Sequence, residues 1–400
     1  MVGSIRKEFN ESFTNEKYQQ YVKEMNGAYP GAIGFRLAET PLFIPKSFTQ
    51  QMLSTCESII DLMLQPDFYT LTKKAIPNEF LVPDENKYPD FIAFDFGICE
   101  NDRGELEPQL VEMQGFASLF AFQIWQDEVI HKCFNIPANY SSYLNGFNKE
   151  SYCKLLQDII SDGVPLQNCI LLELFPQKQK TRIDFLFTKE YIGIETVCLT
   201  ELIRDGKRLF YKRGEQLIEI KRIYNRIIFD ELAQQSQSIQ DKGKIFFEEL
   251  DVEWVPHPNW FYRISKYTLP FIKHKNVPST TFLNELQTIP EDLENYVLKP
   301  LFSFAGQGVV IDVTKHDIEA VEDRKNWILQ RKVKYADAIV TPDGCAKAEI
   351  RLFFFWPKNA ARPIATNNLA RLSKGKMIGV RYNADKEWVG GSIAYFEQSQ

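Results

Sequence analysis

The chain has 400 residues, of which 44% are hydrophobic and 25% are charged, a composition typical of globular proteins. Its formal net charge of −6 provides no overall basic field, which argues against general electrostatic attraction to nucleic acid or to an anionic membrane. Seven scattered cysteines without a CxxC pair and four dispersed histidines argue against a disulfide framework and a zinc site.

The first part of the chain alternates helical and strand patterns. In chain order these predict a helix over 46–66, the arms of a β-hairpin over 91–98 and 109–114, helices over 117–134 and 148–162, and a strand over 168–175. The last of these is a continuous apolar run, which is typical of a strand covered on both faces.

Strand patterns dominate the rest of the chain. They predict a strand, a helix-like turn and a second strand over 182–202, a hairpin over 207–228 that turns at Arg213-Gly214-Glu215, and strands over 296–301, 308–313, 326–335, 346–356 and 376–382. The Gln- and Ser-rich residues 233–244 are the best candidate for a flexible stretch. Alternating strands and helices over this length predict an α/β or α+β fold in several lobes.

Residues 296–311, YVLKPLFSFAGQGVVI, place a lysine where a strand ends and a loop of small residues begins. Glycines allow backbone N–H groups to approach phosphate oxygens closely, and Lys299 adds a point charge. The stretch matches neither GxxxxGK[ST] nor a GxGxxG that opens a helix, so it predicts a strand–loop–strand cover for phosphates. Taken alone, it is more typical of a β-hairpin with a glycine turn and a surface lysine.

The predicted hairpin carries Asp95 on one arm and Glu112 and Gln114 on the other. Residues two apart on a strand face the same side, so two carboxylates and an amide oxygen could meet as hard ligands for Mg²⁺. By spacing alone, a solvated hairpin face is the better interpretation. Further along, NWILQRKVKY (326–335) predicts a strand whose backbone could meet a purine ring, or a plain edge strand, since edges favour Lys and Arg.

These motifs together resemble the ATP-grasp superfamily. The resemblance rests on YVLKPLFSFAGQGVVI, WILQRKV and the tail NNLARLSKGKMIGVRYNADKEWVGGS, and it covers roughly 85–130 and 210–392. The order of the motifs, hairpin first and Lys-Gly loop later, resembles the circularly permuted branch with glutathionylspermidine synthetase and eukaryotic glutathione synthetase. This branch clamps ATP and Mg²⁺ between antiparallel sheets and joins a carboxylate to an amine through an acyl phosphate.

The resemblance implies roles for individual residues. It assigns metal binding to Asp95, Glu112 and Gln114. ATP binding falls to Lys299, Ser303, Ala305, Gly306, Gln307 and Gly308 around the phosphates and to Leu329, Gln330, Arg331, Lys332 and Val333 at the adenine. Substrate binding falls to Arg222, Arg226 and Ser118, with a charged structural strand as the equal alternative for the two arginines.

Three positions depart from the family pattern. Ala93 stands where relatives have an arginine two residues before Asp95, Gln114 stands in place of Asn, and Ser303 stands where some relatives have a metal-binding Glu. A missing arginine weakens stabilisation of the transferred phosphoryl group. Arg371 and, more weakly, Arg351 are the candidates to replace it as catalytic residues; the alternatives are a solvated turn and a charge at the end of an apolar strand.

The leading functional hypothesis is therefore an ATP- and Mg²⁺-dependent carboxylate–amine ligase that acts on small molecules. A nucleotide-binding protein that has lost ligase chemistry is the alternative, and an unrelated α/β protein is a third. The expected parts are 1–135 with the N-terminal helices and the metal hairpin, 136–290 as a substrate or lid lobe, and 291–400 as the ATP lobe. No signal peptide and no membrane span are expected, which favours a cytoplasmic protein without nucleic-acid or membrane partners.

Overall fold

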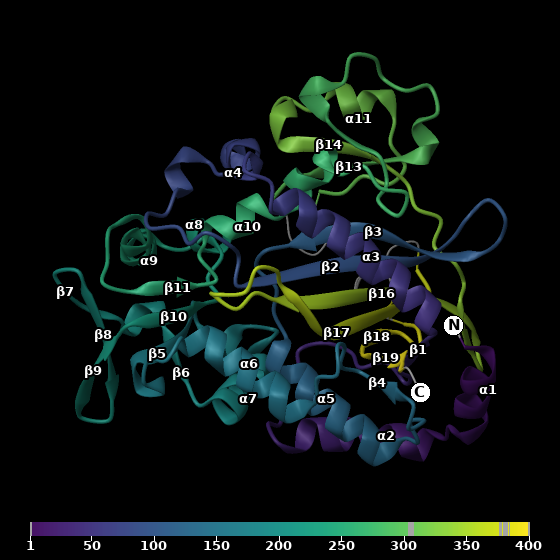
Figure 1. Ribbon diagram of the computed structural model, residues 1–400, viewed down its shortest axis with the longest axis horizontal. Helices are drawn as coiled ribbons and strands as arrows, with labels where there is room; N and C mark the ends of the chain where they lie inside the picture. The colour runs from purple at the N-terminus through teal and green to yellow at the C-terminus, as the bar shows by residue number, and fades with distance from the viewer. Residues whose placement is uncertain (1, 303–307, 376–377, 379–382, 384, 399–400) are drawn as a thin grey trace.

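A six-stranded antiparallel sheet lies at the centre of the computed structural model, which describes residues 2–302, 308–375, 378, 383 and 385–398 (Figure 1). The strands run in the order β18-β17-β16-β2-β3, and β15 pairs with β16. Their bounds are β2 Phe91–Glu100, β3 Leu106–Gln114, β15 Ile339–Thr341, β16 Gly344–Phe355, β17 Ile364–Ser373 and β18 Gly390–Ser392. Segments far apart in the sequence therefore build one sheet.

The two faces of this central sheet differ in chemistry because side chains alternate along each strand. One face packs Phe94 of β2 and Ile350 of β16 in the same apolar core as Met52 and Ile59 of helix α3 (Lys46–Met63) (Figure 1). The opposite face carries charged side chains over its middle. A β-bulge between Asp95 and Phe96 shifts the register of β2 against β3.

A second sheet is parallel and is covered on both faces. Its order is β11-β10-β5-β6, with β5 Cys169–Glu173, β6 Glu195–Cys198, β10 Arg222–Asn225 and β11 Glu253–Val255. Leu171 packs with residues of the helices α5 Phe120–Cys133, α6 Lys149–Ser161 and α7 Arg182–Ile192, whereas Leu172 packs into the core on the other side. The prediction of a doubly covered strand at 168–175 is confirmed.

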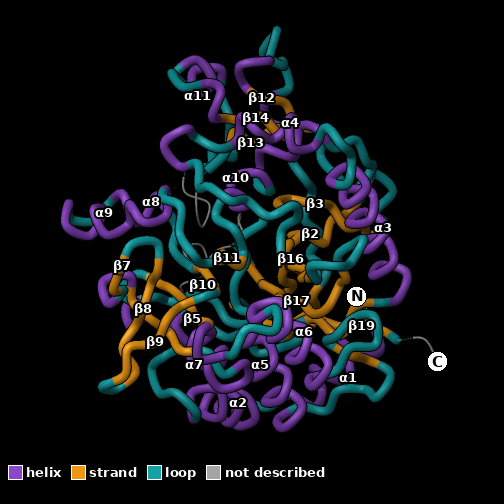
Figure 2. The backbone as a smooth tube through the Cα atoms, turned by 60° about the vertical axis from the view of Figure 1, so that its left-hand side comes forward, coloured by secondary structure: helices purple, strands orange, loops and turns teal. Residues whose placement is uncertain are grey.

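A third, smaller sheet stands over the β3 side of the central sheet (Figures 1 and 2). Its antiparallel strands are ordered β12-β14-β13, with β12 Thr280–Phe282, β13 Tyr296–Pro300 and β14 Trp327–Arg331, and helix α11 Lys315–Glu319 lies beside it. We refer to it as the small sheet. The expected strand over 308–313 is wrong, since only an isolated bridge joins Val310 to Leu298.

The remaining elements surround these three sheets. Two minor sheets have the orders β1-β19-β4 and β7-β8-β9, and the second of them projects from the body at the left of Figure 1. The strands are β1 Leu42–Ile44, β4 Tyr140–Ser141, β7 Ile203–Asp205, β8 Arg208–Arg213, β9 Gln216–Ile220 and β19 Ala394–Glu397. The other helices are α1 Gly3–Ser12, α2 Asn15–Gly27, α4 Phe68–Thr72, α8 Phe229–Ala233, α9 Gln237–Gly243 and α10 Asn259–Arg263.

Most of the other predicted elements are present, but two further segments differ, and the expected strand over 376–382 lies outside the described residues except for residue 378. Residues 182–192 form helix α7 instead of a strand. Ile183 and Phe187 lie four residues apart on its buried side, and Gly193 ends the helix with a φ of 89°, so helical spacing overrides the strand preference of the aromatic residues. Part of the segment 233–244, expected to be flexible, forms helix α9.

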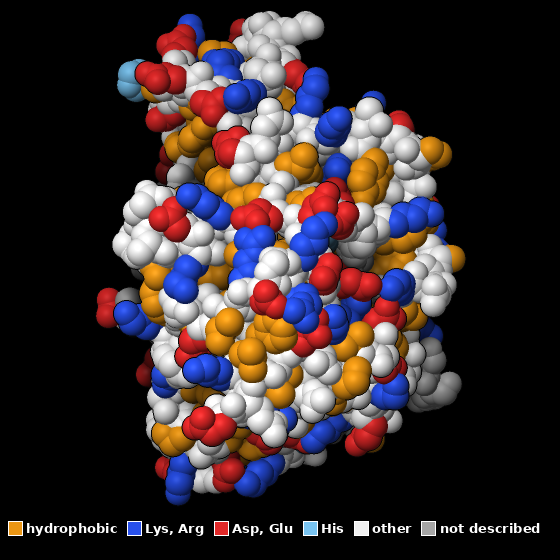
Figure 3. Space-filling view, turned by 90° about the vertical axis from the view of Figure 1, so that its left-hand side faces the viewer, with side chains coloured by type: hydrophobic (Ala, Val, Ile, Leu, Met, Phe, Trp, Pro, Cys, Tyr) orange, Lys and Arg blue, Asp and Glu red, His pale blue; other side chains and the backbone are white. Residues whose placement is uncertain are grey.

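The surface agrees with the expectation from net charge. On the face shown in Figure 3, Lys and Arg side chains are interspersed with Asp and Glu side chains. This face therefore carries no large basic patch. Among the described residues, no helix is both long and apolar enough to cross a bilayer, and all seven cysteines are free.

Candidate functional site

The hairpin β2–β3 brings its three predicted metal-site residues to one face of the central sheet. Asp95 lies directly opposite Glu112 in the strand register, and Gln114 lies opposite Ala93. The Gln114 amide Nε2 donates a hydrogen bond to Asp95 Oδ2 at 3.3 Å. The hairpin therefore brings the three side chains together.

Arginines from the neighbouring strands β16 and β17 point at the same aspartate. Arg351 is the register partner of Asp95, and it donates from Nε to Oδ1 at 2.6 Å and from Nη2 to Oδ2 at 2.7 Å. Arg371 reaches Asp95 Oδ2 at 3.4 Å from Nη2. The Asp95 side chain is 1% exposed, so a single buried carboxylate is shared by two guanidinium groups.

A second carboxylate, Glu349, lies next to this arrangement on β16. Its Oε2 is 2.9 Å from Nη2 of Arg371, its register partner on β17, and its Oε1 accepts a hydrogen bond from the Tyr335 hydroxyl. The Tyr335 ring lies so close to Gly97 that a Cβ there would come within 2.7 Å of the ring. A residue without a side chain at position 97 thus allows Tyr335 to reach Glu349.

Two lysines complete the site from the side of the small sheet. Lys299 Nζ donates to Gln330 Oε1 at 2.6 Å, across β13 and β14, and is 3.4 Å from the backbone oxygen of Val111 in β3. Lys266 Nζ is 3.2 Å from Glu112 Oε1. We call the whole set the polar cluster; it consists of Asp95, Glu112, Gln114, Lys266, Lys299, Gln330, Tyr335, Glu349, Arg351 and Arg371.

Burial and mutual charge shift the protonation equilibria of the polar cluster. Burial alone raises the pKa of Asp95, but the charges of Arg351 and Arg371 outweigh it and lower that pKa below its ordinary value. Burial raises the pKa of Glu349 despite the opposing charge of Arg371. Burial lowers the pKa of the Lys299 ammonium to about 8. The cluster therefore holds Asp95 ionised, while Lys299 loses its proton more readily than an ordinary lysine.

As arranged, the polar cluster does not fit a magnesium ion. Both oxygens of Asp95 accept hydrogen bonds from Arg351, and Glu112 pairs with Lys266. The Gln114 amide donates to Asp95, so the two groups are bonded to each other. Within the described part of the chain, no group of three or more His, Cys, Asp or Glu residues is disposed to hold a metal ion.

The predicted ATP-binding residues fall into two groups. Ser303, Ala305, Gly306 and Gln307 lie outside the described residues, while Gly308 is described, with a φ of 75° that favours glycine. Leu329, Gln330 and Arg331 belong to β14, and Lys332 and Val333 follow it.

The interpretation of β14 as an edge strand is wrong, because it pairs with β12 on one side and β13 on the other. The backbone N–H groups of Arg331 and Lys332 already donate to Ser279 and Asn295. A purine at this strand would therefore have to use backbone groups other than these two.

Of the three predicted substrate residues, Arg222 lies apart from Arg226 and Ser118. Arg222 bonds the backbone oxygens of Ile160 and Ile159 at 2.8 and 3.0 Å and forms an ion pair with Glu253, so its charge is used within the parallel sheet. Arg226, just after β10, instead approaches the end of the hairpin. Its Nη1 donates to the Ala117 oxygen at 2.7 Å, beside the half-buried Ser118.

Arg226 keeps unused hydrogen-bonding capacity. It is 8% exposed, its guanidinium lies 4.5 Å from the Phe116 ring centroid, and its buried Nε has no hydrogen-bond partner among the described residues. Glu173 lies close enough for the Arg226 charge to oppose the effect of burial, which raises the pKa of that carboxyl to about 8.

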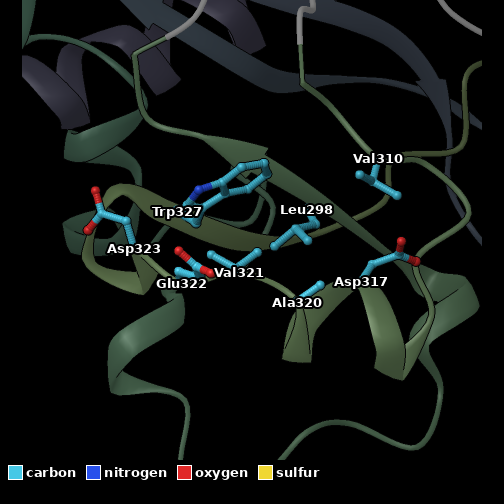
Figure 4. Close-up of a pocket in the computed structure, with 8 residues that line it drawn as sticks. All are labelled: Leu298, Val310, Asp317, Ala320, Val321, Glu322, Asp323 and Trp327. Carbon is cyan, nitrogen blue, oxygen red and sulfur yellow. The ribbon is translucent and has the colours of Figure 1, made fainter.

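A hollow of about 420 Å³ lies on the other face of the small sheet (Figure 4). Leu298, Val310 and Trp327 line it together with the carboxylates of Glu322 and Asp323. Because side chains alternate along β13, Leu298 faces this hollow while Lys299 faces the polar cluster. The hollow is thus separate from the predicted phosphate site.

Sequence reasoning did not identify Lys266, Tyr335 or Glu349 as members of the site. Glu349 had a usable signal, because it and Arg351 alternate with apolar residues in AEIRLFFFW and so share a strand face. Lys266 has no such local signal, and only the tertiary fold brings it to Glu112.

Comparison with known proteins identifies the fold but not a family. No protein-family model and no curated protein sequence matches the chain. Among solved structures, a glutathione synthetase-like effector from Globodera pallida in the apo form is similar, with a TM-score of 0.57 and 10% sequence identity. The match covers 97% of this chain and 98% of that one. At this identity the likeness shows the fold alone: it agrees with the expected mixed α/β, glutathione synthetase-like fold, while the circular permutation and the ATP lobes stay predictions.

Proposed function

We propose that this chain binds ATP between the central sheet and the small sheet and uses it to join a carboxylate to an amine. The observation that carries the proposal is the convergence of cationic side chains from two sheets on one buried face. Lys299 comes from the small sheet, and Arg351 and Arg371 come from the central sheet. Such an arrangement suits a triphosphate, whose charges lie several ångströms apart.

In the proposed reaction, a carboxylate oxygen of the substrate attacks the γ-phosphorus of ATP. The bond from that phosphorus to the bridging oxygen breaks, and ADP leaves with the electron pair. The amine nitrogen then attacks the acyl carbon and expels inorganic phosphate, so an amide forms and one proton is released. Lys299 and Arg371 would hold the phosphates in place, which contributes orientation and charge stabilisation.

Arg226 is the residue that best suits the substrate carboxylate. Its guanidinium has an unpartnered Nε among the described residues, and it bonds the backbone of Ala117 at the end of the hairpin that carries Glu112. A bidentate contact to a carboxylate is the usual use of such a group. Arg222 does not share this role, since its donors are used by the backbone and by Glu253.

A second candidate function is nucleotide binding without ligation. The specific observation in its favour is the bidentate pair between Arg351 and Asp95, together with Ala93 in the position of the family's arginine. An arginine held at both ends by a carboxylate is less available to a phosphoryl group in the transition state. Phe353, the register partner of Ala93 on β16, fills the neighbouring space with an apolar ring.

A hydroxylamine assay separates ligase function from nucleotide binding without ligation. Hydroxylamine traps an acyl phosphate as a hydroxamate, so the natural amine does not have to be known. The full chain would be incubated with ATP, hydroxylamine and pools of amino acids, short peptides and other small carboxylic acids. Ligase function predicts hydroxamate and ADP in equal amounts with at least one pool, both lost in Lys299→Met. ATP binding without hydroxamate from any pool would favour the second candidate.

A further inference from the structure

The positive charge of the polar cluster exceeds its negative charge. Four cationic side chains, those of Lys266, Lys299, Arg351 and Arg371, face three carboxylates, those of Asp95, Glu112 and Glu349. Mg²⁺ at a nucleotide site is held by oxygen ligands, of which the protein supplies one or two carboxylates beside the substrate phosphates. In this cluster the cationic side chains outnumber the carboxylates, which suits an anion.

Each carboxylate in the cluster already has a cationic partner. Arg351 holds both oxygens of Asp95, Arg371 holds Glu349, and Lys266 holds Glu112. A metal ion would have to displace at least one of these partners, and the Arg351 side chain is only 12% exposed. Displacement would leave a buried guanidinium without its counter-charge, which opposes metal binding.

The unbalanced positive charge can be assigned to specific atoms. Within the described residues, the Lys299 ammonium donates to the Gln330 amide oxygen and the Val111 backbone oxygen, and both of these groups are neutral. Arg371 has a buried Nε that meets no hydrogen-bond acceptor in the described part of the chain. Both groups can therefore gain an anionic partner without losing a carboxylate.

We propose that this site binds the triphosphate group of its ligand without a divalent cation, with Lys299 and Arg371 supplying the charge that a metal ion would otherwise supply. The inference rests on the proposed nucleotide site. It adds that the ligand binds as the free triphosphate and not as the magnesium complex. It also changes the role of Asp95 from metal ligand to a positioning residue, which orients Arg351 and Arg371.

The test is calorimetric titration of the full chain with ATP in excess EDTA and again in excess MgCl₂, with tripolyphosphate alone in a parallel series. We expect ATP to bind in EDTA with an affinity within about threefold of that in MgCl₂. Tripolyphosphate separates recognition of the phosphates from recognition of the nucleoside. Binding at least about tenfold tighter in MgCl₂ would overturn the inference and leave the nucleotide site intact. No ATP binding in either buffer would overturn both.

Variants of the carboxylates sharpen the result. Glu112→Gln removes the negative charge that lies next to Lys266. The Glu112 side chain is 32% exposed, so the fold should tolerate this substitution. If Glu112 only balances charge, ATP binding in EDTA becomes about two- to fivefold tighter. If Glu112 is a metal ligand, binding in MgCl₂ weakens and binding in EDTA stays the same. Asp95→Asn provides the same comparison at the second carboxylate, provided that this variant folds. Arg362→Gln, which removes a surface ion pair with Glu57, is the matched control.

Discussion

Arg351 donates two hydrogen bonds of 2.6 and 2.7 Å to the Asp95 carboxylate, although the two residues are 256 positions apart in the sequence. The pair joins the predicted metal hairpin to β16, which carries Arg351, one of the two predicted catalytic arginines; the other, Arg371, lies on β17. Its geometry means that neither residue can act on a ligand without affecting the other.

The first prediction concerns the stability that depends on this pair. Asp95→Asn or Arg351→Gln alone should lower the free energy of unfolding by about 3–5 kcal/mol, because each leaves a buried charge uncompensated. The double variant should cost little more than either single variant, and urea unfolding of all three measures the coupling. Lys154→Ala, in an exposed pair with Asp158, serves as control and should change stability within error. Additive effects of the two single substitutions would contradict the coupling.

The second prediction concerns the pH dependence of ATP binding. Lys299 holds its charge below a pKa of about 8, set chiefly by burial, with Lys266 lowering it and Glu112 and Glu349 raising it. ATP affinity measured in EDTA should therefore begin to fall near pH 8 and decrease by up to about tenfold per unit at higher pH. Lys299→Met should remove this dependence. A wild-type affinity that stays level from pH 7 to about pH 9.5 would show that Lys299 does not meet the phosphates.

The third prediction concerns stability at the same residue. The folded-state pKa of Lys299 lies below its ordinary value, so the buried charge destabilises the fold fully below about pH 8, and the effect is relieved as pH rises toward 10.5. Lys299→Met should raise the thermal midpoint at pH 7 by about 2 °C, and the gain should shrink above pH 8. Thermal scans of both proteins across this range give the comparison. A variant less stable than wild type at pH 7 would mean that the bond to Gln330 outweighs the burial of the charge.

The fourth prediction separates two buried arginines, Arg222 at the start of β10 and Arg226 just after this strand. Arg226→Gln should weaken binding or turnover of the substrate carboxylate at least about tenfold while ATP binding is unchanged. Arg222→Gln should instead lower stability and leave substrate affinity unchanged, since Arg222 bonds the end of α6 and Glu253. Steady-state kinetics on a substrate found in the hydroxamate screen, with urea unfolding beside it, distinguishes the two. Equal effects of both substitutions on substrate affinity would remove the special role of Arg226.

Local patterns in the sequence predicted the parts of the site that depend on neighbouring residues. Asp95 and Glu112 could be placed opposite each other because a hairpin fixes the pairing of its own arms. Lys299 could be placed at a strand end from its motif. Its contact with Gln330 required the antiparallel register of β13 and β14, which no local pattern specifies.

The rest of the site depends on contacts between distant segments. Glu349 and Arg371 meet because β16 and β17 pair, and β17 was not predicted as a strand. Helix α7 was predicted as a strand because its aromatic residues favour strands. The role of Asp184 in the first turn of this helix depends on a contact with a distant segment. In the folded protein the Asp184 carboxylate accepts hydrogen bonds from the backbone N–H groups of Leu119, Ala121 and Phe122 at the start of α5.

The most direct test of the central claim, that the polar cluster binds ATP, is calorimetric titration of ATP into wild type, Lys299→Met and Arg362→Gln. If the polar cluster binds ATP, wild type has one site, Arg362→Gln has the same affinity, and Lys299→Met loses about 10- to 100-fold, since a hydrogen bond to a charged group contributes about 1.5–3 kcal/mol. Equal ATP affinity in wild type and Lys299→Met, or no binding to any of the three proteins, would contradict it.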